Sequence, residues 1–349
     1  MRGGRSLSPS TEQAAAEEFR SRFDRLRLEG LHPAEPTAAA TFEAAAQAAR
    51  PVAAECLPLG VAVVMHLYPL CALRCVPLPW WSAANLRRAL LLRTIDRHSL
   101  ILANAGSERA AGAHAAVTLT RTRDGVRVDG TYEYMSLAHV ADVVMFSAPL
   151  AGSPYTMFCA ADLHGESVRI GPSRFAGSMK LSDTCPVTFV NHRVPSHRYI
   201  LIPNEGALNC MAQYQRSWFQ LLLGESYLAR IEDLQCRWNL PRPTEQIASL
   251  NELARLREYA LRLLDEADAP SAVESLARVT AAMKLRISWH AQGTAAALRG
   301  IDDSSASELG YLRLQPTSDE RILKSIETRL VSIGPRKPSP HGLLAFLKG

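Results

Sequence analysis

The order of three kinds of segment along this chain constrains its fold more than any other feature. Residues 13–100 have apolar side chains at helical spacing, residues 101–205 hold short strand-like segments, and helical spacing returns over residues 206–349. The stretch 177–203 closes the β part, because it alternates apolar and polar side chains and contains a Val-Pro exit. This order predicts an α+β fold.

The composition is that of a globular protein with more than one packed unit. The chain has 349 residues, of which 47% are hydrophobic and 21% are charged. Its net charge of +5 is modest and no basic stripe is interleaved with aromatic residues, so we expect an anionic ligand or carrier and no nucleic acid. No run reaches the ~20 apolar residues of a membrane span, and no apolar segment follows the N-terminal arginines, so we expect a cytoplasmic protein.

The seven cysteines lack the spacing of a disulfide framework, which fits a reducing compartment. Cys71 and Cys75 would share one helical face near His66, and a metal site there is the alternative to buried thiols. We expect buried thiols and no metal site, because a ligand-spaced pair needs further ligands from elsewhere.

The first part of the chain predicts a helical domain over residues 13–100, after a disordered N-terminus over residues 1–12. The expected helices are residues 12–28, residues 41–50 ending before Pro51, residues 59–75 as a buried pair interrupted at Pro69, and residues 83–92 capped by Ser82.

The middle part predicts a central antiparallel β domain over residues 101–205. Val117 and Leu119 alternate with polar residues before an Asp124-Gly125 turn, which is a strong hairpin signal. Further strands are expected at residues 143–147, 155–160, 167–170 and 187–190. No helical segment separates these strands, so we expect consecutive strands to pair antiparallel in a small barrel or sandwich.

The last part predicts a C-terminal helical bundle over residues 206–349. Its apolar stripes run through residues 211–231, 253–263, 279–291 and 322–330. Four amphipathic helices in succession are typical of an up-down four-helix bundle.

Two short motifs flank the predicted hairpin. Gly106-Ser107-Glu108 precedes it, and Tyr134-Met135-Ser136 ends its second strand. With Leu59–Leu73, which is similar to a pocket-lining helix, their order resembles the flavin-dependent acyl-CoA dehydrogenase family over residues 42–330. The resemblance implies that Gly106 and Ser107 meet the phosphate side of the cofactor, and that Tyr134 and Ser136 lie under the flavin.

Other motifs of this family are altered here. Residues 101–105 stand where Thr-Glu-Pro is expected, Arg237 begins a degenerate Arg-x-x-Phe-Gly, and Gly310 lies in the remnant of a Gly-Gly-x-Gly-Tyr loop. These losses affect the pyrophosphate and adenine ends of the site more than the isoalloxazine end. The resemblance still implies FAD, with Arg237 and Gly310 as further cofactor-binding candidates.

Ordinary structural roles compete with these assignments. Ser107 and Ser136 are also residues that bond their own backbone in turns, and Tyr134 is an aromatic of the kind that strands favour. His66 lies in an apolar helix, where a core histidine with satisfied hydrogen bonds is expected rather than a catalytic acid.

Glu327 is the first candidate for a catalytic base. Its segment DERILKSIETRL resembles the stretch that carries the base in the family, although Thr328-Arg329 replaces the usual Gly-Thr. On a helix Glu327 falls at the edge of an apolar face, where partial desolvation raises the pKa of a carboxylic acid. The alternative is a surface glutamate that bonds Lys324.

Glu225 on the first helix of the bundle is the runner-up, since some relatives carry their base there. Its alternative is a structural role, as an intrahelical partner of Arg230 or a polar residue facing the bundle, and we prefer that role.

The resemblance implies FAD-dependent dehydrogenation, or oxidation, at Cα–Cβ of an acyl or aminoacyl thioester in a specialised biosynthetic pathway. The thioester would be carried on CoA or a carrier protein, and the enzyme would be a homodimer or homotetramer. In such chemistry a carboxylate takes the α proton while the flavin accepts the hydride. Two alternatives stay open: a flavin-dependent monooxygenase of the same fold, which the missing Thr-Glu-Pro favours, and a flavin-free lyase, cyclase or scaffold.

Overall fold

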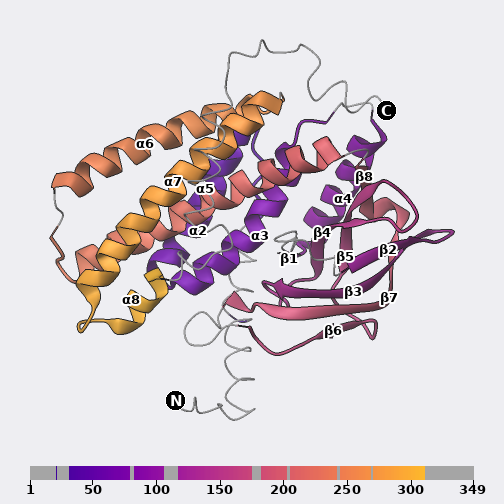
Figure 1. Cartoon of the computed structure of the whole chain (residues 1–349), viewed down its shortest axis with the longest axis horizontal. Helices are drawn as coiled ribbons and strands as arrows, with labels where there is room; N and C mark the ends of the chain where they lie inside the picture. Colours follow the sequence, from indigo (N-terminus) through magenta and orange to yellow (C-terminus); the bar gives the residue numbers. More distant parts are fainter. Residues whose placement is uncertain are drawn as a thin grey trace.

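The computed structural model describes Ser21 and residues 31–78, 82–105, 117–174, 182–202, 205–241, 244–268 and 270–310. Within these residues, seven α-helices and two four-stranded sheets form the α+β fold that the sequence predicts (Figure 1). The helix expected over residues 322–330 lies outside the described residues, as does all but Ser21 of the helix expected over residues 12–28.

Three helices precede the sheets: α2 (Ala38–Glu55), α3 (Leu57–Cys75) and α4 (Ala83–His98). The Thr37 hydroxyl caps α2 by accepting a hydrogen bond from the Ala40 backbone N–H at 3.1 Å. Ser82 caps α4 in the same way, accepting from Asn85 at 3.0 Å, which confirms the predicted start of this helix. The helix ends six residues beyond the expected Leu92, at His98.

Both prolines expected to end helices lie inside them, at Pro51 in α2 and Pro69 in α3. The predictions that Pro51 ends a helix and that Pro69 divides a helix pair are therefore wrong. A proline removes one backbone hydrogen bond, but α3 is buried almost all round and α2 buries an alanine stripe, so packing outweighs that loss. A Cβ on Gly60 of α3 would lie 2.4 Å from Ala53 Cβ of α2, which shows how closely these helices approach.

The β strands form two sheets with orders β1-β4-β5-β8 and β2-β3-β7-β6. Their bounds are β1 Leu102–Asn104, β2 Val117–Arg121, β3 Gly125–Met135, β4 Val143–Pro149, β5 Thr156–Asp162, β6 Val168–Ile170, β7 Cys185–Pro195 and β8 Tyr199–Ile202. The β2–β3 hairpin around Asp124-Gly125 is confirmed, with Arg121 opposite Val126. The strands expected at residues 143–147, 155–160, 167–170 and 187–190 are confirmed as β4, β5, β6 and part of β7.

The two sheets pack face to face around aromatic rings, as in the predicted barrel or sandwich. The Phe146 ring in β4 lies 5.4 Å from the Tyr132 ring in β3 and 6.1 Å from the Phe189 ring in β7. The expected antiparallel pairing of consecutive strands is confirmed for β2–β3, β4–β5 and β6–β7. It is wrong elsewhere, because β1 pairs with β4 in parallel, and β3 and β5 have β7 and β8 as their second neighbours. Bridges at Ala105–Met135 and Leu119–Leu150 join the sheets at their edges.

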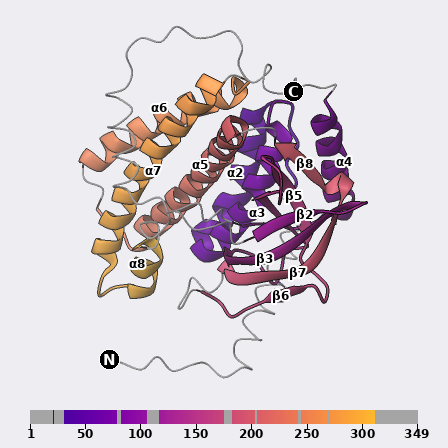
Figure 2. The ribbon, with the colours of Figure 1, turned by 45° about the vertical axis from the view of Figure 1, so that its right-hand side comes forward.

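Four helices follow the sheets: α5 (Glu205–Arg237), α6 (Thr244–Asp265), α7 (Pro270–Leu298) and the short α8 (Asp303–Gly310). The apolar stripes expected over residues 211–231, 253–263 and 279–291 coincide with α5, α6 and α7. α5 is central and packs against α2, α3 and α7. Figures 1 and 2 both show α2 and α3 between the sheets on one side and α6 and α7 on the other.

One apolar cluster runs from the helices into both sheets, and a smaller cluster lies under α4. By length and composition α3 could cross a membrane, but 89% of its most apolar window is buried inside the protein, as in a core helix. The continuous core means that helices from both ends of the chain and the β sheets pack on one another directly. The division at residues 100 and 205 stays a prediction.

Candidate functional site

The end of β3 turns an aromatic side chain out of the sandwich. Between Tyr132 and Met135 the register with β7 shifts, because three steps along β3 match two along β7, from Val187 to Cys185. Such a bulge reverses the alternation of side chains and re-aims one of them. Tyr134 is consequently 54% exposed, whereas Met135 is buried.

Directly after the bulge, a buried cluster of hydroxyl groups joins β3 to the segment before β7. Ser136 is 8% exposed, and its Oγ lies 3.0 Å from Thr184 Oγ1, which lies 3.0 Å from Ser182 Oγ. Backbone bonds hold the two segments together, because Leu137 donates to the Ser182 carbonyl and Ala138 to the Asp183 carbonyl. These contacts define what we call the Ser136 turn, residues 134–139 with residues 182–185.

Two residues of the Ser136 turn adopt left-handed backbone conformations. Leu137 has φ 61° and Asp183 has φ 49°. An L residue other than glycine is strained in this region, and such strain concentrates at functional sites where the surrounding structure enforces it. The turn is therefore a candidate site on backbone grounds as well as on the nature of its side chains.

A seam connects the Ser136 turn to the helices. Ala105 bridges to Met135, and the amide of the neighbouring Asn104 is hydrogen-bonded to the Tyr68 hydroxyl on α3. The Tyr68 ring in turn lies 5.2 Å from the Phe219 ring on α5. Side chains from a strand and two helices thus meet beside the end of β3.

His66 stabilises this seam as a core residue. Its Nδ1 accepts from the Leu102 backbone N–H at 3.0 Å, so the ring is protonated at Nε2, which donates to the Leu31 carbonyl at 3.0 Å. Both nitrogens are occupied and the side chain is fully buried, which confirms the expectation of a core histidine.

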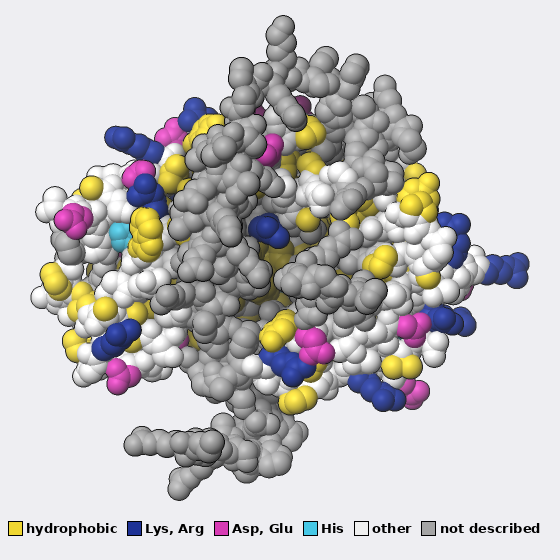
Figure 3. All heavy atoms as spheres, in the orientation of Figure 1, with side chains coloured by type: hydrophobic (Ala, Val, Ile, Leu, Met, Phe, Trp, Pro, Cys, Tyr) yellow, Lys and Arg dark blue, Asp and Glu magenta, His cyan; other side chains and the backbone are white. Residues whose placement is uncertain are grey.

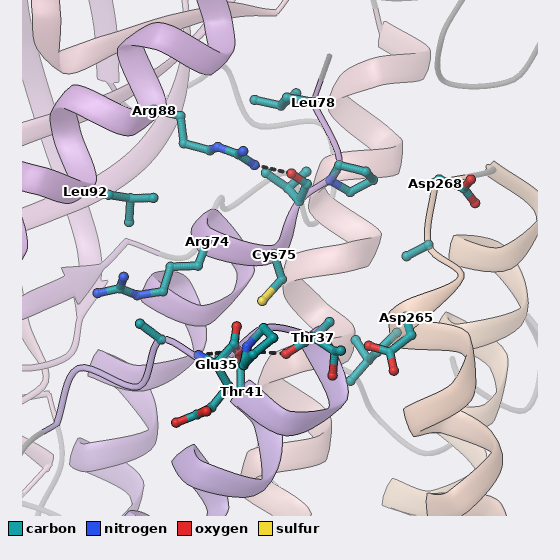
Figure 4. Close-up of a pocket in the computed structure, with 17 residues that line it drawn as sticks. Glu35, Thr37, Thr41, Arg74, Cys75, Leu78, Arg88, Leu92, Asp265 and Asp268 are labelled. Atoms are coloured by element: carbon teal, nitrogen blue, oxygen red, sulfur yellow. Dashed lines mark hydrogen bonds between the residues drawn. The ribbon is translucent and has the colours of Figure 1, made fainter. Parts of the chain in front are cut away.

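A separate open pocket of about 670 Å³ lies where the N-terminal end of α2 and the middle of α4 meet the C-terminal ends of α3 and α6 (Figure 4). Glu35, Arg74, Arg88, Asp265 and Asp268 line it, so it carries both signs of charge. Tyr68 and the pocket residue Cys75 are seven residues apart on α3, a distance of about 10 Å along the helix axis. The residues that line the pocket do not include any of the Ser136 turn.

Cys75 points into this pocket, but its chemistry is that of a protonated thiol. Burial raises the pKa of Cys75 to about 11, and burial also raises the pKa of Cys71. A thiol in this state is a weak nucleophile. Both nitrogens of His66 are engaged as well, so neither hydrogen-bonding position of this ring faces the two thiols.

Glu225 lies in a buried charge cluster between α2, α5 and α6. Arg257 donates from Nε to Glu225 Oε1 at 2.6 Å, and its two terminal nitrogens bond Glu43 at 2.8 and 2.7 Å. Arg50 adds a contact of 3.5 Å to the other Glu225 oxygen. The expected intrahelical partner, Arg230, is not the partner of Glu225, since it bonds Ser305 and Glu308 of α8 instead.

Of the remaining sequence candidates, the two that the structure describes do not lie at the Ser136 turn. Arg237 ends α5 and pairs with Asp233 at 2.8 Å, and Gly310 ends α8. In Figures 1 and 2, α8 lies at the helical end of the molecule, well away from β3. Gly106, Ser107 and Glu327 lie outside the described residues.

The sequence analysis missed His139, Asp183, Thr184 and Cys185 of the Ser136 turn. Asp183, Thr184 and Cys185 fall inside the segment 177–203, where the alternation of side chains indicates only a strand. His139 is bonded to Asp183, 44 positions away, and no local pattern in either segment signals that pairing.

A scan against protein-family models and a search of curated proteins give no match. Among solved structures, the complex of TdsC from Paenibacillus sp. A11-2 with FMN and indole matches with a TM-score of 0.69 and 16% identity, over 95% of this chain and 98% of that one; TdsC is described as a dibenzothiophene monooxygenase. KijD3, in complex with FMN and a dTDP-linked amino keto sugar, matches with a TM-score of 0.69 and 17% identity, over 97% and 98% of the two chains.

FkbI, described for biosynthesis of the methoxymalonyl extender unit of a polyketide, matches with a TM-score of 0.66 and 14% identity, over 90% and 93% of the two chains. The chain shares the fold of TdsC, KijD3 and FkbI. Identities this low establish the architecture and leave the reaction to be argued from the site.

Proposed function

We propose that this protein is an FMN-dependent monooxygenase whose flavin ring lies against the Ser136 turn. The observation that carries the proposal is the bulge at the end of β3, which exposes the Tyr134 ring two residues before the buried Ser136 hydroxyl. A flat aromatic ligand can stack on the first group and hydrogen-bond to the second.

The residues of the turn fit a flavin. Tyr134 offers an aromatic surface, Ser136 and Thr184 offer hydroxyl groups, and Asn104 and Tyr68 border the adjoining seam. When bound, the flavin supplies the redox chemistry and the protein orients it and excludes water. No described residue of the turn is a lysine or arginine, so phosphate recognition would fall to other parts of the chain.

FMN is proposed in preference to FAD. The altered motifs of the sequence are those that serve the pyrophosphate and adenine, which FMN lacks. Two of the similar structures, TdsC and KijD3, are described with FMN bound.

Monooxygenation is proposed in preference to thioester dehydrogenation because the latter needs a free carboxylate beside the flavin. Glu225 has both carboxylate oxygens in ion pairs with Arg257 and Arg50. The dehydrogenase hypothesis then rests on Glu327 alone, outside the described residues. The description of TdsC as a monooxygenase also supports the proposal.

Oxygen uptake and the colour of the bound flavin distinguish the three candidate functions. The full chain is loaded with FMN, reduced by a separate flavin reductase, and mixed with oxygen; we expect oxygen uptake that requires the reductase. In a second arm, acyl-CoA thioesters are added anaerobically to the oxidised protein, and we expect no bleaching. Bleaching by a thioester would contradict the proposal in favour of dehydrogenation, and a protein that stays colourless with added FMN or FAD would favour the flavin-free alternative.

A homo-oligomer remains part of the proposal. Ile247 and Tyr259 on α6 and Trp289 on α7 are 49%, 43% and 59% exposed. Figure 3 shows hydrophobic side chains among charged ones on the face where Figure 1 draws α6 and α7. Large apolar side chains on the outside of a bundle are typical of a subunit interface, and a dimer or tetramer by mass photometry would support this part.

A further inference from the structure

We propose that His139, Asp183 and Cys185 form a binding site for a divalent transition metal, with Zn²⁺ as the best match. His139 follows the end of β3, Cys185 begins β7, and Asp183 precedes it, so the site joins the two segments of the Ser136 turn. The three potential ligand atoms lie within 4.8 Å of one another.

The spacing of the three atoms matches the size of a metal ion. His139 Nδ1 lies 2.7 Å from Asp183 Oδ1, and Cys185 Sγ lies 3.8 Å from each of them. A point equidistant from three atoms with these separations lies about 2.0 Å from each, and bonds from Zn²⁺ to nitrogen, oxygen and sulfur are about 2.0–2.3 Å long. An ion slightly out of the plane of the three atoms therefore reaches bonding distance with only small shifts of the side chains.

The ligands are held in place by the backbone around them. Asp183 Oδ2 accepts from the His139 backbone N–H at 2.6 Å, which leaves Oδ1 directed at the imidazole. The Asp183 carbonyl accepts from the Ala138 N–H at 3.1 Å, and Asp183 itself adopts the left-handed conformation. Hydrogen bonds of this kind orient metal ligands in established metal sites and sharpen their affinity.

The burial of the three groups suits a metal site better than a surface ion pair. Cys185 is 1% exposed, the Asp183 side chain 14% and the His139 side chain 38%. The sulfur would be shielded, while the histidine side stays open to solvent for entry of the ion and for a fourth ligand. Thiolate, imidazole and carboxylate together favour Zn²⁺ over Mg²⁺ or Ca²⁺, which prefer oxygen ligands.

Metal binding at this site displaces the proton of the Cys185 thiol. Burial and the Asp183 carboxylate raise the pKa of Cys185 to about 12, so the metal-free thiol is protonated. Binding of Zn²⁺ as the thiolate complex releases that proton to solvent. The bound ion would then lock the two segments that carry Ser136 and Thr184, a structural role independent of the proposed flavin chemistry.

The test uses the full chain after removal of metal by a chelator. Zn²⁺ or Co²⁺ is added, unbound metal is removed by gel filtration, and elemental analysis counts the metal. We expect about one ion per chain, and a Co²⁺ d–d absorption typical of a tetrahedral site with sulfur. Cys185→Ser and His139→Gln should each weaken binding at least tenfold, whereas Cys159→Ser, another buried strand cysteine, should not.

Two results would overturn the inference. One is a wild-type chain that retains no stoichiometric metal. The other is a Cys185→Ser variant that binds Zn²⁺ as tightly as the wild type. The wild-type count and its Co²⁺ spectrum decide the matter even where a variant folds poorly. Neither measurement uses flavin or turnover, so a failure here is distinct from a failure of the proposed function.

Discussion

Arg257 of α6 donates a hydrogen bond of 2.6 Å from Nε to the buried Oε1 of Glu225 on α5. The Glu225 side chain is only 5% exposed, and its two carboxylate oxygens face this guanidinium and the more distant Arg50. The same guanidinium bonds Glu43 of α2 and lies 5.4 Å over the Phe42 ring. One arginine thus links three helices. Glu225, the second candidate for a catalytic base, is one of the residues that it binds.

Loss of this link should destabilise the helices markedly. Arg257→Leu leaves a buried carboxylate with only Arg50 nearby, and we expect a loss of about 2–4 kcal/mol in the free energy of unfolding, measured with urea. Glu225→Gln in the Arg257→Leu background should restore part of it, since the stranded charge is removed. The exposed pair of Arg237 and Asp233 is the control, and Arg237→Leu should cost less than about 1 kcal/mol. Equal costs for the two arginine variants would contradict the account of the cluster.

The contact between α2 and α3 should be sensitive to a single methyl group. An added Cβ at Gly60 would lie 2.4 Å from Ala53 Cβ and 2.6 Å from Ala53 Cα, so Gly60→Ala must push the helices apart. We expect a loss of about 2–3 kcal/mol in thermal or chemical unfolding. At Gly293 in α7 an added Cβ would meet nothing within 4 Å, and Gly293→Ala should stabilise by about 0.5–1 kcal/mol. A neutral Gly60→Ala would show that the two helices are not in close contact.

Stability should fall on mild acidification because of His192 in β7. Burial lowers the pKa of His192 below its usual 6.5, and its Nδ1 bonds Ser167 at 2.8 Å. The unfolded chain therefore binds more protons than the folded one between that lowered pKa and 6.5, so the free energy of unfolding rises with pH through this window and levels off above it. The pKa of His290 is lowered by burial and by Arg286, and this residue contributes in the same direction.

The measurement is the free energy of unfolding between pH 5 and pH 8, as a function of pH. His192→Gln should flatten the slope, whereas His164→Gln, at an exposed position, should leave it unchanged. A slope identical in the wild type and the His192 variant would rule out this source of pH dependence.

Flavin binding should depend on the residues at the end of β3. Tyr134→Ala removes the exposed ring and Ser136→Ala removes a buried hydroxyl, and each should weaken FMN binding about five- to fiftyfold, equivalent to about 1–2 kcal/mol. Quenching of FMN fluorescence gives the dissociation constant. The matched control is Tyr155→Ala, a 39% exposed tyrosine next to β5. If Tyr155→Ala weakens binding as much as Tyr134→Ala, the flavin does not lie at the Ser136 turn.

Much of the architecture could be predicted from local patterns in the sequence. The Asp124-Gly125 turn and the Ser82 cap are signals within a few residues, and both the hairpin and the helix start there. The helix ends predicted at Pro51 and Pro69 are wrong, because a proline in the sequence indicates only that one backbone hydrogen bond is lost. The compensating burial of α2 and α3 comes from partners elsewhere in the chain.

The site could be predicted only where the resemblance supplied a motif. It led to Tyr134 and Ser136, but the bulge that exposes one and buries the other depends on the register with β7. His139 and Cys185 meet across 46 positions of sequence, and Glu225 finds Arg257 across 32. Pairings at such separations are set by the tertiary fold, so neither the cluster of His139, Asp183 and Cys185 nor the actual partner of Glu225 could be found from spacing.

The visible spectrum of the purified full chain with FMN tests the central claim most directly. Titration of the protein into FMN, followed by gel filtration, should give a yellow protein with about one flavin per chain and a shifted flavin band, because the ring moves from water to an aromatic surface. Tyr134→Ala should lose this colour at the same concentrations while Tyr155→Ala keeps it. A wild-type chain that elutes colourless, with all the flavin in the small-molecule fraction, would contradict the account.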